Sequence, residues 1–274
     1  MATNLRGGMT TINIIGAGRV GATFLRLFER LDGVRIGDVA SGSLRSAQAA
    51  VTGGGAGRAV ELTDMSPADI WLITVPDDRI SDIAAQISAP PAIAVHCSGF
   101  KSSDALASLA DKGWKTASCH PVRSFADPDA AANAFAGTYC AIEGTAASEV
   151  SDLIRRIGGV PFDVLPEKKA IYHAAAVFSN NFTTVIQQIA LDAWREAGVD
   201  PDTAKSLCAS LLTATAENVA LLGPQQALTG PAARGDMQVL VEQQAALAAW
   251  EPRYAKLYED FSAMARALKS NGSL

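Results

Sequence analysis

The chain has 274 residues, of which 49% are hydrophobic and 19% are charged, and its formal net charge is −5. This composition is typical of a folded globular protein rather than a disordered one, and the length predicts about two domains. The negative balance, without a cluster of Lys and Arg, excludes a typical nucleic-acid-binding surface. No apolar stretch reaches the roughly 18 residues of a membrane span, so we expect no membrane partner.

The termini and the cysteines predict a cytoplasmic protein. The first eight residues, MATNLRGG, lack the apolar core of a signal peptide. Cys97, Cys119, Cys140 and Cys208 show neither C-x-x-C nor metal-ligand spacing. We therefore expect reduced, mostly buried thiols and no metal site.

The first predicted element is a strand, Ile12–Ile15, which leads into the glycines of GAGRVG and a helix over Arg19–Leu31. Gly16 permits a tight turn, Gly18 leaves room for a pyrophosphate, and Gly21 lets the helix pack on the strand. The helix N-terminus would point its N–H groups at the phosphates. The pattern predicts a dinucleotide site; the residues assigned to it are Gly16, Ala17, Gly18, Arg19, Val20 and Gly21.

Strand and helix patterns then alternate as far as residue 165. The predicted strands are Val34–Ala40, Ala59–Leu62, Ile70–Val75, Ala92–His96, Lys115–Cys119, Tyr139–Glu143 and Pro161–Val164. The predicted helices between them are Leu44–Val51, Ile80–Ile87, Ser102–Lys112 and Ala147–Ile157, and the glycine run at 52–57 is expected to form a turn. Near-continuous apolar strands joined by helices indicate a parallel sheet covered on both faces.

From residue 167 the strand patterns vanish and helical periodicity takes over. It runs through Lys168–Glu196, Asp202–Leu222, Asp236–Trp250 and Pro252–Lys269. The expected fold is therefore α/β, with a doubly wound Rossmann domain over residues 9–165 and an all-helical C-terminal domain over 166–274.

In a doubly wound sheet, ligands bind beyond the carboxyl ends of the strands. Asp38, which could bind a ribose diol as in NAD enzymes, falls inside its predicted strand rather than at its end. Ser41, Ser43 and Arg45 follow that strand and suit a 2′-phosphate, so NADP is favoured over NAD. The alternative is that Arg45 is only a solvated residue at a helix start.

Three further segments contribute candidates at strand ends. Val75 and Pro76 follow the strand IWLITV and are expected beside the cofactor, while Asp77 or Asp78 would cap the next helix. Ser98 follows a strand in HCSG and is also assigned to the cofactor. These loops and HPVRSF hold His96 and His120, and histidine suits proton transfer near neutral pH. A structural role is the alternative for each.

The segment KKAIYHAAAVFSNNF, 168–182, joins the two predicted domains. At about 100° per residue, a helix would place Lys169, His173 and Asn180 on one narrow face. Such a stripe is costly to bury without partners. We therefore expect it to face a polar cleft between the domains, with Lys169, His173, Asn180 and His120 as the catalytic candidates. Whether Lys168 or Lys169 faces the cleft is left open.

A second polar cluster, LTGPAARGD, lies at 228–236. Asp236 is positioned to cap the helix that follows. Arg234 could bind an anionic substrate group or pair with an acid across a subunit boundary.

The motifs GAGRVG, VPDDRI, HCSG, HPVRSF, YHAAAVFSNNF and TGPAARGD, in this order, resemble a bacterial family that pairs a Rossmann-like NADP-binding domain with a helical C-terminal domain of unknown function. The chain is more distantly similar to the 6-phosphogluconate dehydrogenase superfamily, which includes pyrroline-5-carboxylate reductase. Several β-hydroxyacid dehydrogenases of that superfamily carry a lysine and an asparagine on the helix comparable to that of Lys169 and Asn180, although the spacing here departs from their K-x-x-x-N. Gly42 stands where relatives often carry an arginine.

Two functions follow from these observations. The first is an NAD(P)-dependent oxidoreductase that transfers a hydride to or from a small polar carbonyl, imine or hydroxy compound bound between the domains. The alternative is a non-catalytic NADP-binding sensor or regulatory protein. Under both we expect a homodimer through the Ala-rich C-terminal helices, because their broad apolar faces exceed what one small domain can cover.

Overall fold

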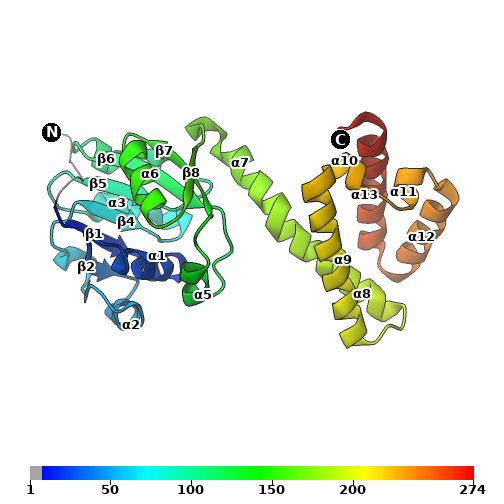
Figure 1. Ribbon diagram of the computed structural model, residues 1–274, viewed down its shortest axis with the longest axis horizontal. Coiled ribbons are helices and arrows are strands. Elements are labelled where there is room, and N and C mark those ends of the chain that lie inside the picture. The colour runs from blue at the N-terminus through cyan, green and yellow to red at the C-terminus, as the bar shows by residue number, and fades with distance from the viewer. Residues whose placement is uncertain (1–7) are drawn as a thin grey trace. The chain divides into compact units, whose positions relative to one another are not determined.

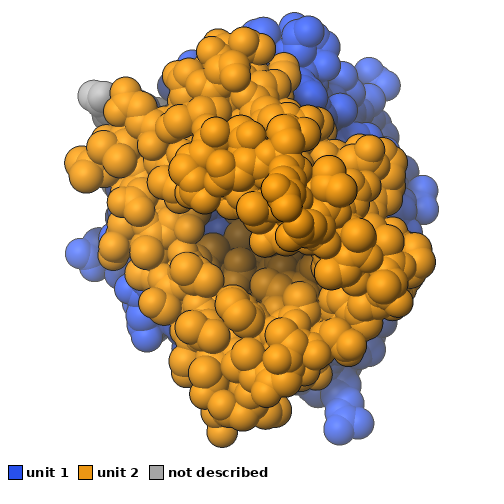
Figure 2. All heavy atoms as spheres, turned by 90° about the vertical axis from the view of Figure 1, so that its right-hand side faces the viewer, with its two compact units in different colours: residues 1–178 blue, residues 179–274 orange. Residues whose placement is uncertain are grey.

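The structure is a computed structural model that describes residues 8–274. The chain divides into two compact units, residues 1–178 and 179–274, which are coloured separately in Figure 2. This division falls within the segment that the sequence assigns to the helical domain. The sequence-based boundary at residue 166 remains a prediction, and each unit is described by itself below.

The first unit is built on one eight-stranded sheet with the order β3-β2-β1-β4-β5-β6-β7-β8 (Figure 1). The strands are β1 (Thr10–Ile15), β2 (Val34–Ala40), β3 (Arg58–Ala59), β4 (Ile70–Ile73), β5 (Ile93–His96), β6 (Lys115–Pro121), β7 (Tyr139–Gly144) and β8 (Val160–Asp163). Order and helical crossovers confirm the predicted doubly wound α/β fold.

One pair of strands departs from the predicted parallel arrangement. β6 and β7 are antiparallel, with Pro121 opposite Cys140 and Ala117 opposite Gly144. The chain leaves β6, forms the unpredicted helix α5 (Pro128–Asn133), and re-enters the sheet beside the end of β6, where the Val122 N–H bonds the Tyr139 carbonyl at 2.8 Å. Because no crossover returns the chain to the opposite edge, β7 must run in the reverse direction.

Both faces of the sheet are buried, as predicted. In β4, Ile70 and Leu72 join one hydrophobic cluster and Trp71 and Ile73 join another, because successive strand side chains point to opposite faces. The helices that cover the sheet are α1 (Arg19–Glu29), α2 (Leu44–Gly54), α3 (Ile80–Gln86), α4 (Ala107–Ala110) and α6 (Ala147–Arg156), with the 3₁₀ turns η1 (Leu62–Asp64), η2 (Asp77–Arg79) and η3 (Ser103–Leu106). This burial fixes the strand ends on which the candidate site depends.

Three local predictions are wrong. The glycine run does not form a turn over its whole length: α2 continues to Gly54 and stops at Gly55, whose φ of 78° is left-handed. A Cβ on Gly54 would lie 1.8 Å from a methyl carbon of Leu25, so glycine there lets α2 pack closely on α1. The predicted helix at 102–112 is divided into η3 and α4, and the predicted strand at 59–62 shrinks to β3 before η1.

The long helix predicted after residue 167 is interrupted. The first unit ends with the 3₁₀ turn η4 (Pro166–Lys168) and the helix α7 (Lys169–Ala176). A stretch of π-helix, η5 (Val177–Phe182), then follows before the chain resumes an α-helical conformation. The spacing of about 100° per residue assumed for this segment therefore does not hold through η5, because each π turn closes over more residues.

The second unit is helical, as predicted. Its helices are α8 (Thr183–Glu196), α9 (Pro201–Leu222), α10 (Pro224–Ala227), α11 (Pro231–Arg234), α12 (Met237–Trp250) and α13 (Pro252–Asn271). Asp200 caps α9 by accepting hydrogen bonds from two backbone N–H groups. The short helices α10 and α11 were not predicted. Within residues 8–274, no helix is long and apolar enough to cross a membrane.

Candidate active site

The glycine turn between β1 and α1 has the geometry that the sequence predicts. Gly16 has a φ of 103°, and a Cβ there would lie 2.7 Å from the carbonyl carbon of Thr74. A Cβ on Gly21 would lie 1.9 Å from the Gly16 carbonyl oxygen, so only glycine permits this approach of helix and strand. A Cβ on Gly18 would meet nothing within 4 Å. The turn therefore leaves open space directly in front of the helix.

The N-terminus of α1 is also chemically suited to an anion. Gly18 is its N-cap residue, no side chain caps it, and its first turn holds no acid. The first N–H groups of a helix have no partner within the helix, and the helix dipole favours negative charge there. Ala17, Arg19 and Val20 form the rest of this turn, as predicted.

The residues after β2 divide into two kinds. The Ser41 hydroxyl accepts a hydrogen bond from the Ala17 N–H at 3.2 Å, which ties the β2 loop to the glycine turn. The Ser43 hydroxyl caps α2 by accepting from the Ser46 N–H. Arg45 lies exposed in the first turn of α2. Two of the three predicted phosphate-binding side chains thus also have structural partners, and Arg45 is the exposed cation.

The Asp38 carboxylate is already hydrogen-bonded within the protein. Its carboxylate accepts two hydrogen bonds from Arg58, at 2.8 and 3.0 Å, and one from the Ser66 N–H at 2.6 Å. Burial alone would raise the pKa of Asp38, but the hydrogen bonds from Arg58 and Ser66 hold it below its ordinary value. The side chain is only 4% exposed and forms part of the sheet interior. It is therefore not available as an acceptor for a ribose diol.

The loops after β4 and β5 are joined by Ser98. Its hydroxyl donates to Asp77 at 2.7 Å and accepts from the N–H groups of Phe100 and Lys101. Val75 and Pro76 precede Asp77 in the β4 loop, at the same sheet end as the glycine turn. Asp77 was predicted to cap the helix that follows, but no side chain caps η2. Asp77 instead accepts the hydrogen bond from Ser98 that joins the two loops.

Lys169 is the most buried charged group of the site, with 1% of its surface exposed. Its ammonium donates to the Ser98 carbonyl at 2.9 Å and to the Ser118 hydroxyl, and it lies 4.0 Å from the Glu143 carboxylate. Burial lowers the pKa of Lys169, and Glu143 opposes that change. Lys168, by contrast, is exposed. Of the two lysines, Lys169 is the one that points into the first unit; which of them faces a cleft between the domains stays a prediction.

The Glu143 carboxylate is itself fully engaged. It accepts hydrogen bonds from the backbone N–H and the hydroxyl of Ser103, both at 2.8 Å. Lys169 and Glu143 therefore join α7 to β7, and Lys169 also links α7 to the ends of β5 and β6. A buried charge pair with satisfied hydrogen bonds fixes the position of the elements that carry it.

Two predicted histidines meet beside Lys169. The ring centroids of His120, at the end of β6, and His173, on α7, are 5.5 Å apart and nearly perpendicular. A Cβ on Gly99 would lie 2.4 Å from Nδ1 of His173 and 2.9 Å from Nε2 of His120. Both rings therefore pack on the β5 loop at a position that only glycine permits.

His120 has a close partner that the sequence analysis did not select. Its Nδ1 lies 2.7 Å from the Tyr172 hydroxyl. The Tyr172 ring in turn packs edge-on against Phe162, with centroids 6.2 Å apart. Nδ1 of His173 is buried and has no hydrogen-bond partner among the described residues. Tyr172 stands next to His173 in the sequence, and this adjacency was the only available signal.

Burial keeps two of the histidines neutral. It lowers the pKa of His96 to about 4 and that of His120 to about 4. Nε2 of His96 bonds the Ser102 carbonyl at 2.9 Å and Nδ1 accepts from the Ser98 N–H, so His96 is a structural residue with its proton on Nε2. This is the structural alternative considered for each histidine, and it holds for His96.

Asn180 belongs to the second unit, as part of η5. Its side-chain amide donates to Asn181 at 3.5 Å, and its carbonyl accepts from the Thr184 hydroxyl. Because Asn180 lies within this π-helical stretch, the regular α-helical spacing that was to align it with Lys169 and His173 does not hold. Its role at the site stays a prediction. Arg234 and Asp236, from the TGPAARGD cluster, form an ion pair at 2.8 Å. The Asp236 side chain does not cap α12.

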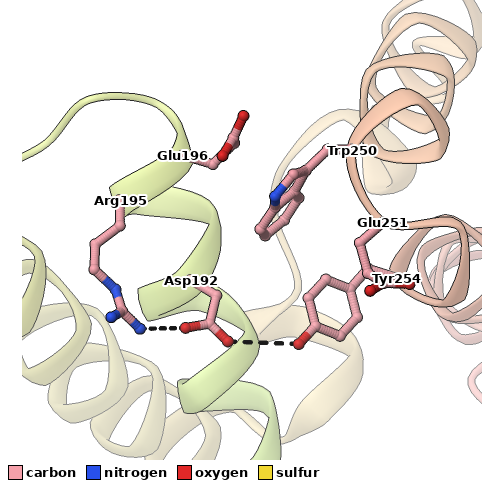
Figure 3. A pocket seen from close by; sticks show the side chains of 6 residues that line it. All are labelled: Asp192, Arg195, Glu196, Trp250, Glu251 and Tyr254. Atoms are coloured by element: carbon pink, nitrogen blue, oxygen red, sulfur yellow. Dashed lines mark hydrogen bonds and ion pairs between the residues drawn. The ribbon is translucent and has the colours of Figure 1, made fainter.

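The second unit has a cavity of its own, of about 390 Å³, shown in Figure 3. Its lining residues come from the C-terminal end of α8 and the junction of α12 and α13: Asp192, Arg195, Glu196, Trp250, Glu251 and Tyr254. Asp192 pairs with Arg195 and accepts from the Tyr254 hydroxyl at 3.4 Å. None of the predicted site residues lines this cavity. Across the part of the chain that the structure describes, no cluster of potential metal ligands occurs.

The comparisons with known proteins agree with this architecture. Residues 1–121 match a family described as a Rossmann-like domain, and residues 138–265 match one described as a domain of unknown function, DUF2520. The chain combines a Rossmann-like domain with a DUF2520 domain. The DUF2520 match includes β7, β8 and α7, and thus Lys169, Tyr172 and His173. No curated protein sequence matches the chain.

Solved structures share the fold over nearly the whole chain. Protein TM1727 from Thermotoga maritima is 27% identical, with a TM-score of 0.78, over 95% of this chain and 99% of that one. BF3122 from Bacteroides fragilis, provisionally described as an NADP oxidoreductase, is 23% identical, with a TM-score of 0.74, over 94% and 98%. A reductive aminase from Aspergillus terreus, in complex with NADPH and ethyl-5-oxohexanoate, is 18% identical, with a TM-score of 0.67, over 96% and 95%.

Proposed function

We propose that the protein is an NADP(H)-dependent oxidoreductase that transfers a hydride to or from a small polar carbonyl, imine or hydroxy compound. One observation carries the proposal. Strands β1 to β6 are parallel, so their carboxyl ends lie at one edge of the sheet. This edge carries both the uncapped N-terminus of α1 behind the glycine turn and the cluster of buried polar groups around His120. Ligands of doubly wound sheets bind at this edge.

The residues of the glycine turn fit a dinucleotide. The open space in front of Gly18 leaves room for a pyrophosphate, and the free N–H groups of α1 supply donors to it. When bound, the cofactor would supply the hydride, which no side chain can provide. The remaining tasks of this chain are to bind the cofactor, orient the substrate and move one proton.

The surroundings of β2 support NADP over NAD. Asp38, the acid closest to the position that binds a ribose diol in NAD enzymes, is held by Arg58 and Ser66. Arg45 is exposed one turn further on, beyond Ser41 and Ser43. A cation and two hydroxyls suit a 2′-phosphate. BF3122, described as an NADP oxidoreductase, and the reductive aminase, solved in complex with NADPH, are consistent with this preference.

The relative exposure of Lys169 and the histidines bears on the proton step. Lys169 is enclosed and its ammonium is already bonded, so we assign it a positioning role. His120 and His173 are partly exposed and remain the candidates for contact with the substrate. Asn180, the remaining catalytic candidate, would orient the substrate oxygen.

The test is a parallel titration of the purified protein with NADPH and NADH, followed by turnover with a panel of carbonyl and imine compounds. We expect NADPH to bind at least tenfold more tightly than NADH, and Arg45→Ala to remove most of this difference. Arg19→Ala is the matched control, because it removes an exposed arginine from the pyrophosphate turn and should weaken both nucleotides alike. No binding of either nucleotide would refute the proposal. Tight binding without turnover would favour a sensor.

We also propose that the protein is a homodimer through the helices of the second unit. Large apolar side chains are exposed along these helices; among them are Val185, Leu211, Leu221, Met237 and Val241, between 50% and 81% exposed. Scattered single apolar residues are normal on a surface, but a set of this size indicates a contact surface. A second copy of the chain is the simplest partner that would cover it.

A further inference from the structure

We propose that Tyr172 is the group that protonates the substrate, and that His120 positions the Tyr172 hydroxyl and returns its proton. The inference rests on the oxidoreductase function proposed above and deepens it. It concerns a residue that the sequence analysis left aside in favour of Lys169 and His173.

Tyr172 and His120 form a closely held pair. The Tyr172 hydroxyl and Nδ1 of His120 are 2.7 Å apart, a short and direct hydrogen bond between α7 and the end of β6. Packing holds both rings: Phe162 lies against Tyr172, and His173 lies against His120. A side chain fixed on two sides keeps its hydroxyl in one place, and a proton donor requires this.

The neighbouring Lys169 is not placed to act as the donor. Lys169 is 1% exposed, and its ammonium donates to the Ser98 carbonyl and the Ser118 hydroxyl beside the Glu143 carboxylate. A group enclosed on all sides cannot reach a substrate without opening the protein. Tyr172 is half-buried, on the same helix, three residues further along. Lys169 therefore holds α7 in place, while Tyr172 has access to a ligand.

Both members of the pair are uncharged at neutral pH, which leaves two possible directions for the hydrogen bond between them. His120 is neutral at physiological pH, because burial and then His173 and Lys169 lower its pKa to about 4, with Asp77 opposing them. Burial raises the pKa of Tyr172 to about 12. A neutral imidazole carries one N–H. With that proton on Nδ1, the Tyr172 oxygen accepts from His120, and its own O–H is free to donate to the substrate.

The proton balance of the reduction is then complete. A bound cofactor would supply a hydride to the carbon of a C=O or C=N bond, and the O–H of Tyr172 gives its proton to the oxygen or nitrogen. The resulting phenolate takes the Nδ1 proton of His120 as Nε2 of the partly exposed ring takes one from solvent water. Proton exchange of the ring with solvent then restores the Nδ1–H form before the next turnover. Both donors are uncharged before the transfer, which fits a neutral carbonyl or imine substrate.

The first experiment compares Tyr172→Phe with Tyr139→Phe. Tyr139 is 61% exposed in the same unit and its ring also packs on Phe162, so the control loses the same hydroxyl from the other tyrosine that contacts this ring. NADPH binding is measured by fluorescence, and turnover by NADPH oxidation with ethyl-5-oxohexanoate and with 1-pyrroline-5-carboxylate. We expect Tyr172→Phe to bind NADPH within twofold of the wild type and to lose about 100-fold or more in kcat. Tyr139→Phe should change neither.

The outcomes separate the two proposals. A wild type that binds no NADPH refutes the oxidoreductase function, and this inference falls with it. A wild type that turns over while Tyr172→Phe keeps more than half of its kcat overturns only the role of Tyr172. Circular dichroism of each variant shows whether it has kept its fold.

The second experiment tests the role of His120, and its NMR part does not depend on knowing the substrate. Nitrogen-15 NMR of the resting protein should show the neutral His120 ring with its proton on Nδ1; a proton on Nε2 would mean that Tyr172 donates to His120, which overturns the inference. In turnover, His120→Asn should retain more kcat than His120→Leu, because an asparagine amide can still donate to Tyr172. Equal losses in the two variants would count against the positioning role.

Discussion

The two units of this chain differ in how much of their helix surface is buried. In the first unit, α1 buries seven residues, among them Phe24, Leu25 and Phe28, and even the charged groups Lys169 and Glu143 are enclosed and paired. In the second unit, α8 buries none of its 14 residues, and the 22-residue α9 buries only Ala204 and Cys208. The first unit therefore encloses the residues of the candidate site, whereas the second leaves much of its apolar helix surface exposed.

The largest expected effect concerns the exposed apolar helix surface of the second unit. We expect the wild type to sediment with the mass of two chains at micromolar concentration, and Leu211→Glu and Val241→Glu to sediment with the mass of one, because each places a charge on an exposed apolar helix surface. Ser210→Glu is the matched control: it adds the same charge to α9 at an exposed polar position. Analytical ultracentrifugation distinguishes the two masses. A wild type with the mass of one chain would contradict the homodimer.

The next effect concerns the buried pair of the first unit. Lys169→Met should lower the free energy of unfolding by about 3 kcal/mol, because it leaves Glu143 as an uncompensated buried charge. Lys168→Met, the same change at the exposed neighbouring lysine, should stay within about 0.5 kcal/mol of the wild type. Urea unfolding monitored by circular dichroism measures both. Equal stability of the two variants would show that Lys169 does not anchor α7.

A smaller effect follows from the buried histidines and has a definite sign. In the unfolded chain a histidine has a pKa of about 6.5, but burial lowers the pKa of His96 to about 4 in the folded protein. The unfolded state therefore binds the proton more tightly. Stability is complete above pH 6.5 and is lost as the pH falls toward 4, by up to about 1.4 kcal/mol per pH unit for each such histidine.

The variant His96→Gln isolates this contribution. It removes the titrating ring while keeping a donor and an acceptor for the Ser102 carbonyl and the Ser98 N–H. We expect its unfolding free energy to fall less steeply than that of the wild type between pH 6.5 and 4. His120, near Tyr172, His173, Lys169 and Asp77, should contribute a similar slope that the variant retains. Parallel slopes for the two proteins would contradict a neutral, buried His96.

The sequence predicted most of the fold and only part of the candidate site, for a physical reason. The glycines of GAGRVG and the apolar strands are local signals, and the turn and the sheet formed as expected. The antiparallel β7 depends on where the chain re-enters the sheet, which no local pattern records. The contact between Tyr172 and His120 joins residues 52 positions apart, so periodicity on α7 alone could not single out Tyr172 over Lys169.

Periodicity also fails where the helix itself changes. The alignment of Lys169, His173 and Asn180 assumed a regular α-helix, and η5 interrupts it. A buried lysine could have been foreseen from Glu143, an isolated acid at the end of the apolar strand YCAIEG, because such a carboxylate needs a partner. A polar residue in an apolar strand thus indicates that a partner distant in the sequence is needed. The spacing of residues along a single helix gives no such indication.

The smallest effect tests how tightly the site of the first unit is packed. Gly99→Ala places a methyl group 2.4 Å from Nδ1 of His173 and 2.9 Å from Nε2 of His120, so both rings must move. Overpacking of this kind costs about 1–3 kcal/mol. Gly42→Ala is the matched control, because its added carbon meets nothing within 4 Å. If the first unit is as rigid as its burial indicates, Gly99→Ala lowers the free energy of unfolding and changes the NMR resonances of His120, while Gly42→Ala does neither. Unchanged His120 resonances in Gly99→Ala would mean that the loop containing residue 99 moves while the two rings stay in place. The site would then be less rigidly packed than the sheet that supports it.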